Sequence, residues 1–174
     1  KLPGVPLLAL PDPLGHAAPA GATLGGLLAV LHALPPHQWA DLVEVDDTPL
    51  GAWLTEAQAA YPTLAEHVPP AHRTRVEAFL QGPPPAPPAQ RALCHNDLGI
   101  EHVLVDPGLG TVTGIIDWSD AAFTDPARDL ALVLRDLGPA GLNAAVHAYG
   151  AGQAAPLLER ARFYARCKLL EDLA

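Results

Sequence analysis

The sequence predicts an α+β fold that is mostly α-helical and contains one small β-hairpin. Leucines recur at helical spacing in the first 81 residues and again after residue 125. Between these regions, two β-branched runs flank the turn sequence Pro107-Gly108-Leu109-Gly110, which is typical of a hairpin. A chain of 174 residues can bury one good core, so we expect one domain or one lobe of a larger one.

The first half of the chain is expected to be helical after a short extended start. Residues 2–10 are interrupted by prolines and are predicted to form a connector or an edge strand. Apolar spacing predicts a first helix over 23–34, and further helices from about 49 to 67 and from about 71 to 81. The Pro-rich segment 82–88 must be extended. It could link two domains, but only helices precede it, so we expect a surface connection.

Three short strands are expected next. Residues 91–95 form the first candidate, and residues 102–106 and 111–117 form the two arms of the hairpin. This region therefore supplies the only sheet that the sequence predicts.

The chain then returns to a helical pattern. Asp125 is a suitable N-cap and Pro126 a suitable first helical residue. Gly138-Pro139 is expected to break this helix, and a shorter helix follows to about Gly150. A final helix is expected from Ala155 to the end of the sequence.

The charge balance argues against nucleic acid as a partner. The chain has 19 acidic and 10 basic residues, a net charge of −9, and its basic residues are scattered rather than gathered on one face. This balance suits a cationic substrate, although ordinary solubility is the favoured explanation. The acidic cluster Asp41, Glu44, Asp46 and Asp47 is interpreted as a solvated face, with attraction of a cationic substrate as the alternative.

The apolar runs are too short to predict a membrane span, and no signal-like segment opens the chain. Cys94 and Cys167 lie far apart in the sequence and are expected to be free thiols in a reducing compartment. Cys94 is expected to act as a small buried apolar residue. A cytoplasmic protein without membrane contact is therefore expected.

The residues that point to chemistry surround the hairpin. A short strand leads into His95-Asn96-Asp97, and the second hairpin strand ends on Asp117, 20 positions later. A loop followed by a hairpin can bring these two carboxylates to a common site. Two convergent carboxylates suit phosphoryl transfer, because one can accept the proton of an attacking hydroxyl and the other can hold the metal that bridges the phosphates.

The order of residues resembles a known family. The pattern matches the kinase loop H-x-D-L-x-x-x-N, with His102 at the Asn position. The segments Ile116-Asp117-Trp118 and Asp125-Pro126-Ala127-Arg128-Asp129-Leu130-Ala131 resemble the aminoglycoside phosphotransferase and choline-kinase-like superfamily, whose loop typically reads His-Gly-Asp. The resemblance implies the C-terminal lobe of a protein-kinase-like fold across residues 1–174. Residues 1–12 would be the interlobe connector, and the N-terminal nucleotide-binding lobe would be absent from this chain.

The resemblance also implies a role for each motif residue. Asp97 would be the catalytic base, and Asp117 and His102 would occupy the two metal-ligand positions. His95 would brace the catalytic loop and Asp129 would pin its backbone. The alternative interpretation of Asp129, with equal weight, is a first-turn acid favoured by the helix dipole.

Two further acidic residues are candidates for the substrate side, Asp120 and Glu101, and Asp120 can equally be solvated surface. The implied reaction is ATP-dependent transfer of the γ-phosphoryl group to a hydroxyl of a small molecule, such as an aminoglycoside, a macrolide or an amino-alcohol. ATP or GTP would be the donor. Mg²⁺ would be the cofactor, with Mn²⁺ as the alternative because imidazole is a softer ligand than oxygen. Macrolide kinases resemble this chain in carrying His at the Asn position.

Two other functions remain open at this point. The residues His95, Asp97, His102 and Asp117 could bind zinc in a metal-dependent hydrolase. The chain could also belong to a non-catalytic kinase-like binding protein. If the kinase interpretation holds, the 174 residues alone should have little activity, because the lysines are Lys1 and Lys168 and no Gly-rich loop precedes a suitable strand.

Overall fold

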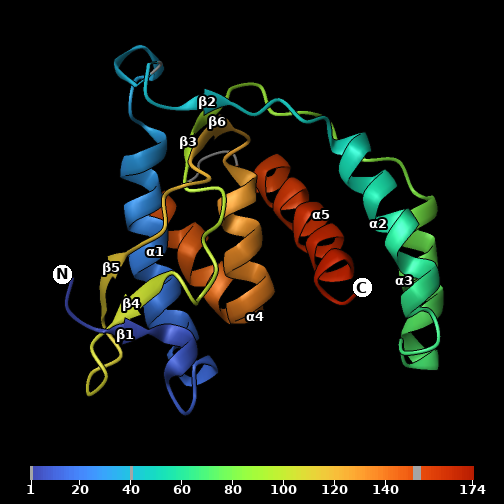
Figure 1. Ribbon diagram of the computed structural model, residues 1–174, viewed down its shortest axis with the longest axis horizontal. Coiled ribbons are helices and arrows are strands. Elements are labelled where there is room, and N and C mark those ends of the chain that lie inside the picture. The colour runs from blue at the N-terminus through green and yellow to red at the C-terminus, as the bar shows by residue number, and fades with distance from the viewer. Residues whose placement is uncertain (1, 40, 151–153) are drawn as a thin grey trace.

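The computed structural model describes residues 2–39, 41–150 and 154–174. Its helices are α1 (Ala17–His32), α2 (Leu50–Leu64), α3 (Pro70–Gln81), α4 (Ala127–Tyr149) and α5 (Ala154–Asp172). Its strands are β1 (Val5–Pro6), β2 (Glu44–Val45), β3 (Ala92–Cys94), β4 (Val103–Val105), β5 (Val112–Ile115) and β6 (Ala122–Thr124). The mostly helical α+β fold is thus confirmed (Figure 1). Lys1, expected in the connector, lies outside the described residues.

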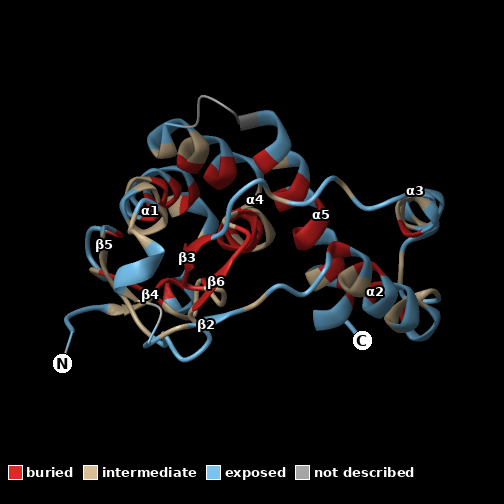
Figure 2. Cartoon of the chain, turned by 90° about the horizontal axis from the view of Figure 1, so that it is seen from above, coloured by how far each residue is buried: buried red, intermediate tan, exposed pale blue. Residues whose placement is uncertain are grey.

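Helices α1, α4 and α5 form the body of the molecule, and their facing sides are buried (Figure 2). Helices α1 and α4 approach closely because glycines line their contact. A Cβ atom on Gly21 or Gly25 would overlap the backbone of Gly141 or Ala145. Small residues at these positions therefore set the spacing of the two helices.

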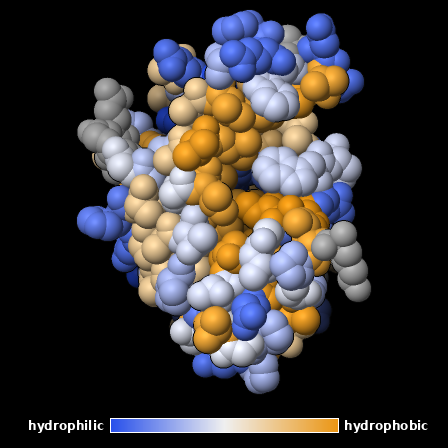
Figure 3. Space-filling view, turned by 90° about the vertical axis from the view of Figure 1, so that its left-hand side faces the viewer, coloured by the Kyte–Doolittle hydropathy of each residue, from blue (hydrophilic) through white to orange (hydrophobic). Residues whose placement is uncertain are grey.

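Helix α1 starts six residues before the predicted helix and extends it toward the N-terminus. The segment Leu14–His32 is long and apolar enough, by length and composition alone, to cross a membrane, with a mean hydropathy of 1.4. The sequence prediction considered only uninterrupted apolar runs, whereas this longer segment also contains Gly, Thr and His residues. Leu24 and Leu28 of this segment are buried in the hydrophobic core. Packing inside the protein is therefore a second explanation for its apolar composition. The side of the molecule on which α1 lies carries much apolar surface, and Leu27 and Val30 of α1 are exposed (Figure 3).

Two small sheets hold the middle of the chain. The predicted hairpin is β4 and β5, paired antiparallel with Val103 opposite Ile115, and β1 adds to it with Val5 opposite Val105. The second sheet has the order β2-β6-β3 and was not predicted. In it β3 pairs antiparallel and β2 parallel to β6. Part of the acidic cluster therefore forms a strand rather than only a solvated face.

The helices after residue 49 lie close to the positions predicted from the sequence. Helices α2 and α3 are joined to β3 by residues 82–91, which form no helix or strand, as expected for a Pro-rich connection. Helix α4 begins at Ala127, and the backbone of Gly138 within it is non-helical, with φ 64° and ψ −168°. The predicted break is thus confirmed, because this residue divides α4 into two helical segments, the second of which ends before Gly150. Helices α2 and α3 lie beyond α5, away from α1 and the hairpin (Figure 1).

Candidate functional site

The catalytic-loop candidate runs from the end of β3 to the start of β4, and Asp117 follows β5 directly. Asn96 and Asp117 have φ angles of 67° and 60°, in the left-handed region that few non-glycine residues adopt. Asparagine and aspartate are the residues that tolerate it best. These two turns bring the loop and the end of the hairpin to one place.

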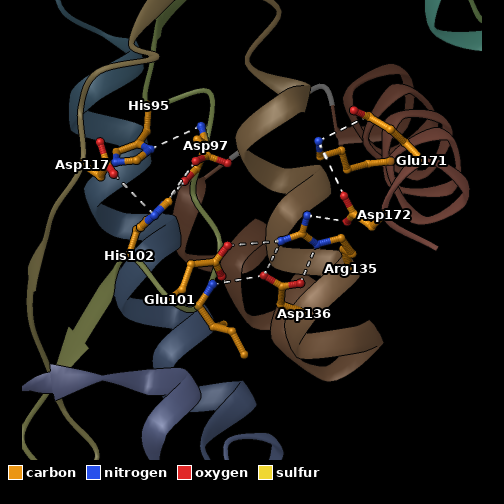
Figure 4. Close-up of polar contacts among 11 residues, drawn as sticks. His95, Asp97, Glu101, His102, Asp117, Arg135, Asp136, Glu171 and Asp172 are labelled. Carbon is orange, nitrogen blue, oxygen red and sulfur yellow. Dashed lines mark hydrogen bonds and ion pairs between the residues drawn. The ribbon is translucent and has the colours of Figure 1, made fainter. Parts of the chain in front are cut away.

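The carboxylates of Asp97 and Asp117 lie on either side of the His102 ring (Figure 4). Nδ1 of His102 lies 2.8 Å from the backbone carbonyl of Asp97 and 3.4 Å from its Oδ2, while Nε2 lies 3.7 Å from Oδ2 of Asp117. Because a carbonyl only accepts, Nδ1 carries the proton in the neutral ring and the lone pair of Nε2 faces Asp117. The site thus presents one nitrogen and one carboxylate side by side.

Both groups of this pair have shifted pKa values. The hydrogen bond to the Asp97 carbonyl raises the pKa of His102, and the nearby carboxylates add to this effect against partial burial. The pKa of Asp117 is lowered, chiefly by a hydrogen bond that the Ser119 hydroxyl donates to its Oδ1 over 2.8 Å. Asp117 is therefore ionised at neutral pH, and its side chain is 54% exposed and open to a cation.

The same pair fits a divalent cation. Two ligand atoms 3.7 Å apart can share an ion that lies about 2.1 Å from each. The donor set mixes a hard oxygen with a softer nitrogen, which favours Mn²⁺ more than an all-oxygen set does.

His95 is not available to such an ion. It is fully buried, its Nε2 donates to the carbonyl of Ile116 over 2.9 Å, and its Nδ1 lies 3.3 Å from the backbone N–H of Asp97. Its ring also meets the edge of Trp118 with centroids 4.6 Å apart. Both nitrogens are occupied, so the proposed zinc hydrolase would lose one of its four ligands.

Asp129 holds the backbone of the loop. It is fully buried, and its two oxygens accept hydrogen bonds from the N–H groups of His95 (3.0 Å) and Asn96 (2.8 Å). His32 was missed by sequence reasoning: its Nε2 lies 3.1 Å from the same carboxylate, and its Nδ1 lies 2.9 Å from the Tyr149 hydroxyl. The only sequence signal was a histidine at the end of an apolar helix.

A potential second metal cluster lies here. Ligand atoms of His32, Cys94 and Asp129 lie within 4.8 Å of one another. Both ring nitrogens of His32 and both carboxylate oxygens of Asp129 already take part in hydrogen bonds. This group is therefore better explained as a buried polar network. Burial also raises the pKa of the Cys94 thiol well above its usual range. Cys94 is buried and free, as predicted.

Arg128 was also missed. Its guanidinium makes a two-point ion pair with Asp46, and its Nη1 lies 3.3 Å from Oδ1 of Asn96. Burial opposes ionisation of Asp46, but the hydrogen bonds from Arg128 and Thr48 outweigh it and lower its pKa. The interpretation of Asp46 as solvated surface was therefore wrong, because its carboxylate forms an ion pair with the buried guanidinium of Arg128.

The two substrate-side candidates lie apart. Asp120 is exposed and lines an open groove with Asn96, Ser119 and other acidic residues. Glu101 instead lies 4.0 Å from Arg135 of α4 (Figure 4). The structure therefore brings Asp120, but not Glu101, to the groove that borders the loop.

A small pocket of about 70 Å³ opens beside Asp97. Its walls come from α2, α4 and α5 and from the loop: Trp53, Asn96, Asp97, Arg128, Ala131, Leu132, Tyr164 and Lys168. Aromatic and cationic side chains thus face the candidate base.

Comparison with known sequences places the chain among phosphotransferases. A family model described as the phosphotransferase enzyme family matches residues 1–164. The viomycin phosphotransferase of Streptomyces vinaceus is 30% identical over 146 residues, which cover 76% of this chain and 47% of that protein. An aminoglycoside 3'-phosphotransferase of Streptomyces fradiae is 39% identical over 67 residues, which cover 34% of this chain and 25% of that protein.

Comparison with solved structures agrees. The apoenzyme of a macrolide 2'-phosphotransferase from Brachybacterium faecium is 28% identical, with a TM-score of 0.68 over 99% of this chain and 60% of that protein. The GDP complex of aminoglycoside 2'-phosphotransferase-IIIa shares the fold at 21% identity, with a TM-score of 0.69 over 98% of this chain and 60% of that protein. The chain spans about half the length of the viomycin enzyme and about 60% of these two structures.

Proposed function

The chain belongs to the phosphotransferase enzyme family, and from this premise we propose that it is the catalytic lobe of an enzyme that phosphorylates a hydroxyl group of a small molecule. The observation that carries the proposal is the placement of His102 between the carboxylates of Asp97 and Asp117, at 3.4 and 3.7 Å. Residues 1–12 would connect this lobe to an N-terminal nucleotide-binding lobe in the full-length protein.

Asp97 would act as the base. Its carboxylate is 36% exposed and lines the pocket beside α2 and α5, where an acceptor can lie against it. A hydroxyl that donates a hydrogen bond to Asp97 is oriented for attack and gives up its proton as the new bond forms. The backbone of this loop is fixed by Asp129, so the carboxylate needs little reorganisation.

His102 and Asp117 would hold the cation, which neutralises charge on the donor phosphates when it is bound. Ser119 keeps Asp117 ionised and oriented. The donor would be ATP or GTP. One neighbouring enzyme was solved with GDP and another with ADP and streptomycin, so an assay with both nucleotides decides between them. Because nucleotide triphosphates are abundant in the cytoplasm, we propose that the protein acts there.

The acceptor is proposed to be an antibiotic with a free hydroxyl. The related proteins are named for viomycin, aminoglycosides and macrolides, and these three classes form the first panel to test. Trp53 and Tyr164 give the pocket aromatic walls, while Asp120 and its acidic neighbours could meet a cationic group farther out.

The test uses the full-length enzyme. Asp97→Asn keeps the size of the side chain but removes the base, and it should lower kcat by about 10²–10⁴-fold on the best acceptor of the panel. Asp12→Asn is the matched control, because an amide oxygen can still accept the hydrogen bond that Asp12 receives from Gly15. Full activity of Asp97→Asn, or no phosphorylation of any acceptor in the panel, would count against the proposal.

A further inference from the structure

Arg128 is a buried cation that touches three separate parts of the chain. It lies in the first turn of α4 and is 4% exposed. Its guanidinium pairs with Asp46, points one N–H at the carbonyl of Thr48 over 3.5 Å, and points another at the side chain of Asn96 over 3.3 Å. One side chain therefore joins α4, the segment that leads into α2, and the catalytic loop.

The same guanidinium also lies over two aromatic rings. Its central carbon lies 5.0 Å from the ring of Trp53 in α2 and 5.6 Å from that of Tyr164 in α5. These two rings meet edge to face, with centroids 5.2 Å apart. A planar cation can stack and form hydrogen bonds at its edge at the same time, which a lysine ammonium cannot.

Asn96 explains why the loop needs this support. Its backbone is left-handed, with φ 67°. Glycine adopts that conformation freely, whereas asparagine adopts it under strain that must be offset by contacts. Asp129 holds the N–H of Asn96 and Arg128 holds its side chain, one residue before Asp97.

Fold stability alone does not account for the arrangement. A buried ion pair contributes little net stability, because desolvation opposes the attraction of the charges. The Nε of Arg128 is buried without a hydrogen-bond partner among the described residues, as is the indole Nε1 of Trp53. A cation placed only to stabilise a core would be expected to use all of its donors.

We propose that Arg128 is a positioning residue that ties the α2–α3 arm (residues 46–81) to the catalytic loop. It thereby sets the width of the pocket between Trp53 and Asp97, and with it the fit of the acceptor. The link between arm and loop is a property of the fold. Only its effect on the acceptor rests on the proposed function.

The first test measures backbone hydrogen exchange in the full-length protein and does not depend on activity. Arg128→Lys keeps the charge but loses the two-point pair and the stacking, and Asp46→Asn removes the partner charge. Both should speed exchange by about ten-fold or more in residues 46–54 and 95–98. The matched control is Arg160→Lys, because Arg160 is also buried and pairs with an aspartate, Asp125, over 2.7 Å without touching Asn96. It should leave residues 95–98 unchanged.

The second test separates positioning from general loss of stability. Arg128→Lys should raise the KM for the best acceptor of the panel by about ten-fold, with the KM for the nucleotide changed by less than about two-fold. The double variant Asp46→Asn/Arg128→Lys should be no worse than Arg128→Lys alone, because that single variant already loses the two-point pair with Asp46.

The outcomes of the two tests are distinguishable. Unchanged exchange in residues 95–98 of both single variants would overturn the link between arm and loop. Faster exchange with equal effects on both KM values would overturn the role in acceptor fit. If no acceptor of the panel is phosphorylated, the proposed function fails, and the exchange result alone decides whether the arm is tied to the loop.

Discussion

His102 gives the site its particular chemistry at the scale of single residues. Its ring is held by a hydrogen bond from Nδ1 to the carbonyl of Asp97, which leaves Nε2 directed at Asp117. A nitrogen ligand in this place favours transition metals over Mg²⁺, which binds oxygen more readily than nitrogen.

Replacing His102 by Asn should therefore change which metal is preferred. We expect His102→Asn to weaken Mn²⁺ binding by about ten-fold or more, since loss of even a group that only hydrogen-bonds to a ligand costs about 10–100-fold in metal affinity, while Mg²⁺ binding changes far less. Titration of the full-length protein with each ion, in the presence of ADP, measures both affinities. His37→Asn, on an exposed histidine, is the control. Equal loss for both ions would contradict the preference for Mn²⁺, and unchanged affinity for both would show that Nε2 is not a ligand.

Metal binding at this site should also depend on pH. The pKa of His102 is raised above its ordinary 6.5 and that of Asp117 is lowered, so Asp117 stays ionised where His102 is still protonated. A protonated imidazole cannot bind a cation, so Mn²⁺ affinity should be full at high pH and fall as pH decreases through the raised pKa of His102. In His102→Asn the affinity should be nearly flat between about pH 6 and pH 8, because no group of the pair then titrates there. Mn²⁺ titrations across this range give the two profiles.

The motif spacing was sufficient to predict Asp97, His102 and Asp117 as neighbours, because each is fixed by one loop and one hairpin. His32 and Arg128 could not be found in that way. His32 meets Asp129 across 97 positions, and Arg128 meets Asp46 across 82. Such contacts depend on how the helices pack, and no local pattern encodes them.

At the scale of elements, the α1–α4 contact is set by glycines. A Cβ atom on Gly25 would overlap the backbone of Ala145, whereas one on Gly26 would meet no atom within 4 Å.

The two glycines should therefore respond in opposite ways to alanine. Gly25→Ala should lower the free energy of unfolding by about 1–3 kcal/mol through overpacking. Gly26→Ala, one position along the same helix, should raise it by about 0.5–1 kcal/mol, because alanine is the better helix former. Urea denaturation of both variants measures the difference. Equal effects would mean that α1 and α4 are not held at this distance by Gly25.

The sequence predicted long elements better than short ones. Helices α2, α3 and α4 and the β4–β5 hairpin carry enough periodic residues to be recognised. Strands β2 and β6 have two and three residues, too few for a pattern, and they form only because they pair with each other and with β3. The start of α1 was missed because Ala17 and Ala20 bury small side chains that give a weak apolar signal.

At the scale of the whole molecule, we propose that this chain supplies a base, a cation site and an acceptor pocket. The sequence of residues 1–174 offers no Gly-rich loop before a strand, and its two lysines lie near its ends. In kinase-like enzymes such a loop and a strand lysine bind the nucleotide phosphates.

Residues 1–174 expressed alone should therefore not phosphorylate an acceptor that the full-length protein phosphorylates. The measurement is transfer of labelled γ-phosphate to the best acceptor of the panel, with equal molar amounts of both proteins. Hydrogen exchange of the loop residues 95–98 in the shorter protein confirms that it is folded. Turnover by the folded shorter protein at the full-length rate would contradict the assignment of the nucleotide site to another lobe.

The position of Asp129 has a consequence for biosynthesis. The loop held by Asp129 precedes it in the chain by more than 30 residues. His95 and Asn96 are therefore synthesised well before the Asp129 carboxylate that accepts their backbone hydrogen bonds. During translation the loop N–H groups have only water as partner, and they reach their final arrangement when α4 emerges and docks. Domains generally fold as units as synthesis proceeds. The nascent chain therefore carries the proposed catalytic residues Asp97, His102 and Asp117 before Asp129 of α4 is available to order the loop.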